Sequence, residues 1–263
     1  MVHVAYLMLL FPLAGFAVLM VAGRRMGDPL AGWVATVAVG AAFVVACLVF
    51  AGLLGLPADH RLVIHDYFTW FSTGGLTVPV GTLVDPLSMT MCLFVTGVST
   101  LIVLYSIGYM KSDRDYSKFF IYMNLFVFSM LLLVLADNLV LTFVGWEGVG
   151  VCSYFLIAFW FERETAASAG KKAFIYNRIG DVGFLVAIFL LFEKTGTVLY
   201  ESGPGGGIFG QLSHLGAGTA TAAVLLLLLA ATGKSAQIPL FNWLPDAMEG
   251  LSLIHISEPT RPY

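Results

Sequence analysis

Apolar runs long enough to cross a lipid bilayer recur along this chain of 263 residues, and they constrain its fold more than any other feature. A membrane-spanning helix needs about 20 mainly apolar residues. We expect such helices near residues 3–23, 30–55, 83–110, 117–136, 138–161, 170–193 and 221–248. The predicted fold class is an all-α polytopic membrane protein with about seven transmembrane helices.

The composition supports lipid as the main surroundings of the chain. Hydrophobic residues make up 59% of the sequence and charged residues 11%, whereas soluble domains carry about 25% charged residues. A soluble enzyme, a nucleic-acid-binding protein, a secreted disulfide scaffold and a disordered tail are therefore excluded. The first residues lack a basic stretch and a cleavage site, so we expect the first run to be a retained span.

No pattern in the sequence favours a cofactor or a metal ion. The cysteines lie far apart inside apolar runs, at Cys47, Cys92 and Cys152. Without a C-x-x-C pair they support neither a zinc site nor an iron–sulfur cluster. Gly205, Gly207 and Gly210 match G-x-G-x-x-G, but a dinucleotide site needs that motif between a strand and a helix. We expect no cofactor in this chain.

Basic residues predict the orientation in the membrane, because cytoplasmic loops hold the excess of Lys and Arg. Eight basic residues fall after the first, third and fifth expected spans: Arg24, Arg25, Lys111, Arg114, Lys118, Arg163, Lys171 and Lys172. The other side has only Arg61 and Lys194. The N-terminus is therefore predicted to lie outside. In the outer connection 57–82, β-branched and aromatic runs flank a Gly-Gly turn, which predicts a short extracytoplasmic β-hairpin.

Ionisable residues inside the spans are the candidate functional groups, because each costs several kcal/mol unless it is paired or hydrated. Glu147 is about nine residues into its expected span, or about 13 Å deep. Glycines at 145, 148 and 150 surround it and allow neighbouring helices to approach closely.

Lys234 is a second such residue, in the expected span 221–248. Pro239 and Pro245 follow it, and each removes a backbone donor and collides with the carbonyl group four residues earlier. We therefore expect a discontinuous seventh helix, broken beside the lysine. Broken helices at membrane depth are tolerated where they line a wet cavity, and transporters use them at ion sites.

Arg178 and Asp181 lie three residues apart on one helix face and can form an ion pair. This pair could simply neutralise itself and orient one helix, and Glu147 with Lys234 could be a static bridge between helices. The combination of Glu147, Lys234 and a broken helix, all expected at similar depth, favours proton transfer instead. A lysine whose charge depends on the position of a neighbouring acid suits a proton carrier.

Four segments carry a resemblance to a known family: 85–91 (DPLSMTM), 122–154 (YMNLFVFSMLLLVLADNLVLTFVGWEGVGVCSY), 171–184 (KKAFIYNRIGDVGF) and 233–250 (GKSAQIPLFNWLPDAMEG). They resemble the large antiporter-like membrane subunit of proton-pumping NADH–quinone oxidoreductase, respiratory complex I. The large subunit of multisubunit Na⁺/H⁺ antiporters shares much of this pattern, but YMNLF and WEGVGVCSY look more like the complex I branch.

The resemblance implies an antiporter-like inverted-repeat fold and assigns proton-transfer roles to Glu147, Lys234, Asp181 and Arg178. It implies no flavin, cluster or quinone site in this chain. Electron transfer would occur in partners: other membrane subunits of complex I and, through them, the NADH-oxidising arm. Residues 1–116 would be N-terminal helices and 117–250 the start of the proton-translocation repeat, in a bacterial inner membrane.

The sequence departs from the family pattern after Gly250, where LSLIHISEPTRPY replaces the expected continuation. We expect 251–263 to be a non-native tail and the chain to be an N-terminal fragment. Two alternatives remain beside proton translocation in complex I. One is the large subunit of a Na⁺/H⁺ antiporter, and the other is a membrane scaffold that moves no protons.

Overall fold

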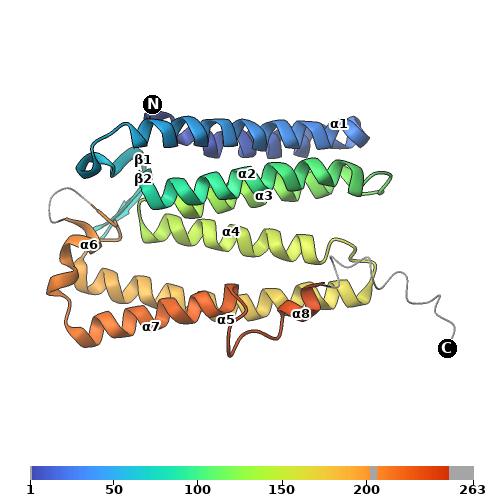
Figure 1. Cartoon of the computed structure of the whole chain (residues 1–263). Coiled ribbons are helices and arrows are strands. Elements are labelled where there is room, and N and C mark those ends of the chain that lie inside the picture. The colour runs from blue at the N-terminus through green and yellow to red at the C-terminus, as the bar shows by residue number, and fades with distance from the viewer. Residues whose placement is uncertain (1, 202–205, 249–263) are drawn as a thin grey trace. The chain divides into compact units, whose positions relative to one another are not determined.

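The computed structural model describes residues 2–201 and 206–248, and it is almost entirely helical (Figure 1). The tail 251–263 and Gly205 lie outside the described residues. The α-helices are α1 (Tyr6–Leu54), α2 (Pro86–Tyr109), α3 (Tyr116–Leu135), α4 (Leu139–Ile157), α5 (Glu164–Thr195), α6 (Gly207–Gln211), α7 (Ala217–Lys234) and α8 (Leu244–Ala247). The strands are β1 (Val63–Thr73) and β2 (Leu76–Val84), and short 3-10 turns cover Val2–Val4, Ala58–His60 and Leu212–His214.

The chain divides into two compact units. Unit 1 comprises Met1–Val149 and Leu191–His214, and unit 2 comprises Gly150–Leu190 and the described part of Leu215–Tyr263. Helix α4 therefore begins in unit 1 and ends in unit 2. The expected division after residue 116 concerns the family architecture and stays a prediction.

Six described helices are long and apolar enough to cross a bilayer: α1, α2, α3, α4, α5 and α7. The first two expected spans fall within α1, which is interrupted at Gly27 (φ 60°, ψ −162°) and Asp28 (φ −82°, ψ 135°). Its halves pack against each other, because a side chain at Gly15 would touch Ala38. One 49-residue element thus holds both spans.

The expected span 221–248 is not one helix. Helix α7 ends at Lys234, turns follow, and helical structure resumes only in the four residues of α8. Lys234 is thus the last residue of its helix and not a residue in the middle of a span. The prolines explain this difference, because Pro239 and Pro245 cannot donate the backbone hydrogen bonds that a continuous helix needs.

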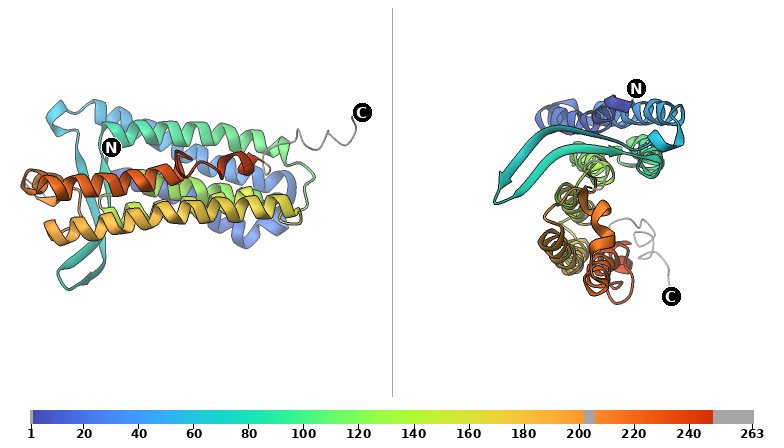
Figure 2. Two further views of the ribbon diagram at one scale, coloured as in Figure 1. Left: turned by 90° about the horizontal axis from the view of Figure 1, so that it is seen from below. Right: turned by 90° about the vertical axis from the view of Figure 1, so that its left-hand side faces the viewer.

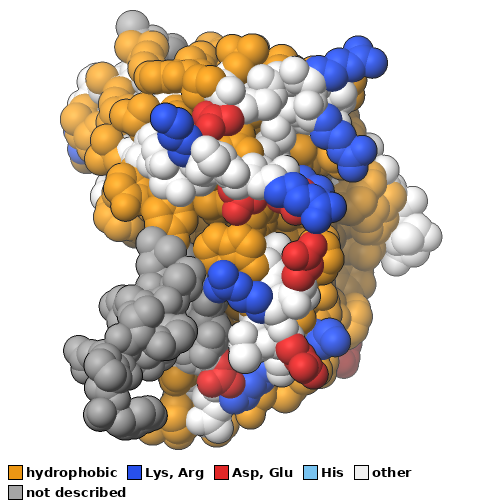
Figure 3. Space-filling view, turned by 90° about the vertical axis from the view of Figure 1, so that its right-hand side faces the viewer, with side chains coloured by type: hydrophobic (Ala, Val, Ile, Leu, Met, Phe, Trp, Pro, Cys, Tyr) orange, Lys and Arg blue, Asp and Glu red, His pale blue; other side chains and the backbone are white. Residues whose placement is uncertain are grey.

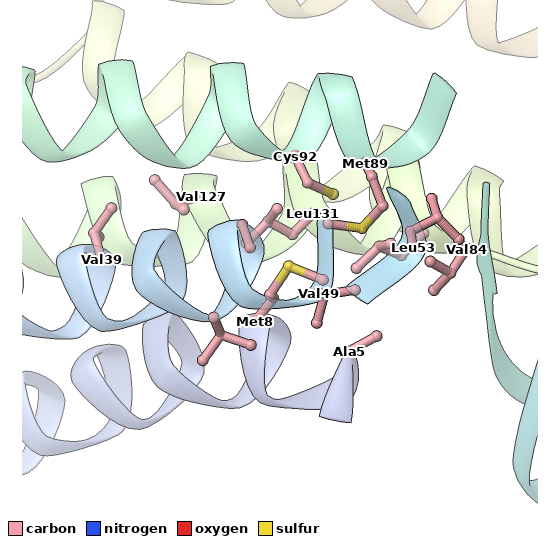
Figure 4. Packing of buried hydrophobic residues seen from close by; sticks show 13 residues of the cluster. Ala5, Met8, Val39, Val49, Leu53, Val84, Met89, Cys92, Val127 and Leu131 are labelled. Carbon is pink, nitrogen blue, oxygen red and sulfur yellow. The ribbon is translucent and has the colours of Figure 1, made fainter. Parts of the chain in front are cut away.

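The core of unit 1 lies where α1, α2 and α3 meet. Figure 4 shows side chains of α1, α2 and α3, among them Met8, Leu53, Met89 and Leu131, pointing toward one another. These four side chains are at most 1% exposed. Glycines and alanines along α1 allow the close helix packing that association in lipid requires.

The outer faces of the helices are apolar, as a lipid-facing surface must be. Along α2, Leu87, Phe94 and Leu101 are exposed at seven-residue intervals and form one stripe. Charged side chains are concentrated at the ends of helices, and Figure 3 shows one such end, where Lys, Arg, Asp and Glu stand among apolar groups. This distribution is typical of a multi-pass membrane protein.

Strands β1 and β2 form an antiparallel hairpin that projects beyond the helices of unit 1 (Figure 2). The pairing runs from Val63 opposite Val84 to Thr73 opposite Leu76. Gly74 and Gly75 form the turn with φ of +54° and +87°, a geometry that strongly favours glycine. The hairpin thus occupies the segment in which the Gly-Gly turn predicted one.

The start of α2 follows directly after β2, and a capping box marks it. Asp85 caps the helix, and Oδ1 accepts a hydrogen bond from the backbone N–H of Ser88 at 2.6 Å. The backbone N–H of Asp85 donates in return to Oγ of Ser88 at 2.9 Å. Pro86 occupies the first helical turn, where its missing N–H costs nothing.

Unit 2 is built on the packing of α5 against α7. An added Cβ at Gly180 would stand 3.0 Å from the carbonyl oxygen of Ala230, and one at Gly183 would stand 2.9 Å from that of Leu226. Gly233 of α7 faces Gly180 in turn. These glycines bring the two backbones close together, which places the end of α7 beside the middle of α5.

Candidate functional site

The end of α7 is held by hydrogen bonds that replace the missing helical ones. The indole Nε1 of Trp243 donates to the carbonyl oxygen of Gly233 at 2.9 Å. The backbone N–H of Gln237 turns back to the carbonyl oxygen of Thr232 at 3.0 Å. Helix carbonyl groups at a C-terminus otherwise lack partners. The backbone after α7 therefore has a defined geometry, and Lys234 lies at the last position of the helix.

Two cationic side chains meet at Gly150 of α4 within unit 2. An added Cβ at Gly150 would stand 2.5 Å from Nζ of Lys234 and 3.3 Å from Nη2 of Arg178. The ammonium and guanidinium groups thus approach the same stretch of helix backbone, through the space that a side chain would fill. Two positive charges brought together destabilise each other, so the charge of Lys234 is sensitive to its surroundings.

Arg178 and Asp181 form the ion pair that their spacing predicted. Nε of Arg178 lies 3.3 Å from Oδ2 of Asp181, and the guanidinium carbon lies 4.6 Å from the centre of the Phe174 ring. Asp181 is buried at 3% exposure, and Asn177, four residues earlier in α5, is buried at 4%. The carboxylate and the aromatic face therefore position a guanidinium group whose far end reaches Gly150.

Glu147 lies in α4 within unit 1, where glycines let α4 pack closely on α3. An added Cβ at Gly145 would stand 2.5 Å from the backbone N of Leu133, and one at Gly148 would stand 2.6 Å from Oγ of Ser129. The expected role of these glycines in close helix approach is confirmed. Glu147 therefore projects from a helix segment whose backbone is tightly held.

The structure brings together Arg178, Asp181 and Lys234, which sequence reasoning had placed on two separate spans. The spacing of Arg178 and Asp181 was enough to predict their pairing. The approach of Arg178 to Lys234 was not predictable, because it depends on how α5 packs on α7. No group of three His, Cys, Asp or Glu side chains suited to a metal ion occurs in residues 2–201 and 206–248.

A second polar cluster lies in unit 1 at the link between α3 and α4. Asn138 caps α4, since Oδ1 accepts a hydrogen bond from the backbone N–H of Leu141 at 2.8 Å. Its Nδ2 donates to the carbonyl oxygen of Pro79 in β2 at 3.0 Å and to Oδ1 of Asp137 at 2.7 Å. The backbone N–H of Tyr200 donates to the carbonyl oxygen of Asp137 at 3.0 Å. Two distant segments, β2 and the segment at Tyr200, therefore converge on this link.

Asp137 and Asp66 form a carboxyl pair at this point. Asp137 is 2% exposed, and its side chain and that of Asp66 both lie against Gly81. Burial, and then the neighbouring carboxyl group of Asp66, raise the pKa of Asp137 to about 7, although the hydrogen bond from Asn138 opposes the shift. Sequence analysis missed this pair, because an Asp-Asn step between two apolar runs is typical of a solvated loop. Only the packing of the hairpin reveals it.

The long apolar helices are those of a multi-pass membrane protein, and they carry buried ionisable groups. A family model described as "NADH:quinone oxidoreductase/Mrp antiporter, TM" matches residues 136–255, and one described as "NADH-Ubiquinone oxidoreductase (complex I), chain 5 N-terminus" matches residues 70–120. The chain belongs to this family of antiporter-like membrane subunits.

Relatives and solved structures agree with this assignment. The chain is 47% identical over 248 residues to NADH-quinone oxidoreductase subunit L of Mycobacterium tuberculosis, covering 94% of this chain and 38% of the relative. It is 39% identical over 250 residues to subunit L of Escherichia coli, covering 93% and 39%. The chain thus spans about two fifths of the length of these relatives.

Two solved complexes contain a similar fold. The Mrp complex from Dietzia sp. matches with a TM-score of 0.78 and 27% identity, over 93% of this chain and 25% of that chain. A membrane-bound sulfane sulfur reductase, described as an archaeal respiratory membrane complex, matches with a TM-score of 0.74 and 20% identity, over 94% and 48%. The second similarity shows the fold alone.

Proposed function

We propose that this chain belongs to a proton-translocating subunit of an NADH–quinone oxidoreductase and that Glu147, Lys234, Asp181 and Arg178 transfer the protons. The observation that carries the proposal is the approach of Lys234 and Arg178 to Gly150 at the end of a broken helix. Ionisable residues inside membrane-spanning segments are rare and mark ion pathways. The 47% identity to a subunit L supports the choice of complex.

The charges of the site suit a switchable proton carrier. When ionised, Lys234, Arg178 and Asp181 sum to one positive charge, which a second carboxylate would balance. Glu147 precedes Gly150 by three residues in α4, and we propose that it supplies this carboxylate. At an effective dielectric constant of about 20, an ion pair at about 4 Å is worth about 4 kcal/mol. Opening such a pair would favour release of the proton from the lysine.

In this mechanism, Asp181 decides how strongly Arg178 acts on Lys234. With Arg178 held by Asp181 at 3.3 Å, the guanidinium charge is partly compensated. If that contact loosens, Asp181 compensates less of the guanidinium charge beside Lys234. The stronger repulsion favours release of the lysine proton. The redox chemistry would take place in partner subunits, and this chain would bind no cofactor.

The placement of basic residues supports an N-terminus outside a bacterial inner membrane. The bend of α1 carries Arg24 and Arg25, and the link between α2 and α3 carries Lys111 and Arg114. These helix ends would face the cytoplasm. The hairpin β1–β2 and the link at Asp137 would then face outward.

The test is Lys234→Met in the complete subunit, assembled in its complex in membrane vesicles. We expect NADH oxidation to continue while the protons moved per NADH fall at least twofold. Lys194→Met is the matched control, because Lys194 is at the solvated end of α5, paired with Glu193 at 3.0 Å. An unchanged proton yield in Lys234→Met would overturn the proposal.

The similarity to the Mrp complex supports a second candidate, the large subunit of a Na⁺/H⁺ antiporter. That function predicts Na⁺-dependent proton exchange without NADH and partners that lack a redox arm. A scaffold, in contrast, predicts that Glu147→Gln lowers the amount of assembled complex without changing the protons moved by each one. Measuring both quantities on the same vesicles separates the three functions.

A further inference from the structure

The carboxyl pair of Asp66 and Asp137 lies outside the group of residues to which the proposed function assigns proton transfer. The two residues come from β1 and from the link between α3 and α4, and both belong to unit 1. They meet across Gly81 of β2, where an added Cβ would overlap Oδ2 of Asp137 and would stand 2.7 Å from Oδ1 of Asp66. Any side chain at this position would therefore separate the two acids or displace the hairpin.

The geometry favours a proton shared between these two acids. Oδ2 of Asp137 is buried, and no side chain or backbone N–H in the described chain donates a hydrogen bond to it. The group opposite is another carboxyl group, and two carboxylates have no hydrogen to share. A hydrogen bond between Asp66 and Asp137 can therefore form only when one of the two is protonated.

The pair is asymmetric in its access to water. Asp137 is 2% exposed and lies at the start of α4, whereas Asp66 is exposed on β1. A proton arriving from the membrane interior would reach Asp137 first, and Asp66 would pass it to bulk water. Binding one proton changes the charge of the pair from −2 to −1, and release of that proton restores −2.

Hydroxyl groups extend this cluster toward the membrane interior. Oγ1 of Thr142 in α4 and Oη of Tyr200 lie 2.7 Å apart, and Thr142 is about 4.5 Å along the helix axis from its first residue. The negative field of Asp137 acts on Tyr200, which places the phenol near the carboxyl pair. Glu147 is about 7.5 Å further along the axis of α4 than Thr142.

Among the described residues, Asp137 also acts electrostatically on Tyr67 of β1 and on Tyr200 of the segment after α5. Burial raises the pKa of both phenols, so they remain neutral where carboxyl groups titrate. His65 lies edge-on to the Tyr67 ring, 4.8 Å between centroids. The described residues of β2 and α4 nearest the pair, Gly81 and Asn138, carry no charge.

We infer that Asp137 and Asp66 form a proton-binding station at the outer membrane rim, through which translocated protons leave for the external water. This inference rests on the proposed function, because it needs protons that arrive along α4. It adds two proton-transfer residues and gives the hairpin a catalytic contribution, since β1 supplies Asp66 and β2 supplies Gly81.

The experiment compares Asp137→Asn and Asp66→Asn with Lys234→Met in the complete subunit, assembled in its complex in vesicles. Asn keeps the size of Asp and cannot carry the transferred proton. We expect Asp137→Asn to lower the protons moved per NADH as much as Lys234→Met does. Glu193→Gln, a change to a 69%-exposed side chain near the end of α5, should leave the yield unchanged.

Infrared difference spectroscopy gives a readout that does not depend on pumping. The intact complex should show a protonated-carboxyl C=O band that titrates near the pKa of about 7, and Asp137→Asn should remove it. Asp66→Asn, at the exposed position, should shift this band even if Asp137→Asn assembles poorly. An unchanged band in both Asn variants, or a lost band with a normal proton yield, would overturn the inference.

The same comparison separates this inference from the proposed function. A normal proton yield in Lys234→Met removes the proposed function. A reduced yield in Lys234→Met together with a normal yield in Asp137→Asn and Asp66→Asn removes only the outer station.

Discussion

The indole of Trp243 donates a hydrogen bond to the carbonyl oxygen of Gly233, the residue directly before Lys234, at 2.9 Å. This contact ties the segment after the helix break to the end of α7. It also gives the Gly233 carbonyl group a hydrogen-bond donor, which the broken helix no longer supplies. The position of Lys234 therefore depends on an aromatic residue nine positions later.

Trp243→Phe should preserve packing against the cluster of Ile157, Ala169 and Ala173 but remove this hydrogen bond. Leaving the Gly233 carbonyl group without its partner should cost about 1–3 kcal/mol of unfolding free energy. We also expect proton translocation to fall, because the end of α7 loses its anchor. Thermal unfolding of the purified complex and vesicle pumping assays measure the two effects. Trp33→Phe, at a 49%-exposed position on α1, should change neither.

Gly150→Ala should impair proton transfer without unfolding the protein. The added methyl group would stand 2.5 Å from Nζ of Lys234, the flexible end of its side chain, so the ammonium must move while the backbones stay in place. We expect at least a twofold loss of protons moved per NADH with normal assembly. Gly218→Ala in α7 is the control, since its Cβ meets nothing within 4 Å. Equal pumping by both variants would show that the approach of Lys234 to Gly150 plays no part in proton transfer.

Asp85→Ala should destabilise the start of α2 by about 1 kcal/mol, because the backbone N–H of Ser88 loses its side-chain acceptor. Asp85→Asn should restore most of this stability, since asparagine caps helices equally well. Chemical unfolding of the purified chain in detergent measures both changes. A result in which Asn is as damaging as Ala would mean that the charge of Asp85, and not its capping bond, is what matters.

The contact between the hairpin and the α3–α4 link should weaken as pH rises. The folded-state pKa of Asp137 is raised to about 7 from an ordinary 3.8, so its contribution to stability is complete below about pH 4 and is lost as pH rises through 7. Hydrogen exchange of the hairpin amides should therefore accelerate beyond the intrinsic rate between about pH 4 and about pH 7, and this additional acceleration should level off above pH 7. Asp137→Asn should remove this additional dependence. A pH-independent protection factor in the intact protein would contradict the shared proton.

Much of the architecture was predictable because lipid imposes simple rules on sequence. Apolar runs of about 20 residues identified the spans, and the Gly-Gly turn located the hairpin segment. In the structure, the start of α2 depends on purely local chemistry, the cap of Asp85 and Pro86 in the first turn. The end of the seventh span was harder, because two prolines predict a break but not its exact residue. The helix stops at Lys234, several residues before Pro239.

The sequence by itself determined where helices cross lipid, which ionisable residues they carry, and that Arg178 and Asp181 share a helix face. These properties depend on transfer free energies and helical periodicity, which act over a few neighbouring residues. Only the tertiary structure decided that Lys234 and Arg178 meet at Gly150, and that Asp66 reaches Asp137 across Gly81. Those contacts join residues far apart in the chain, and they form because glycines allow backbones to approach closely enough for long side chains to meet.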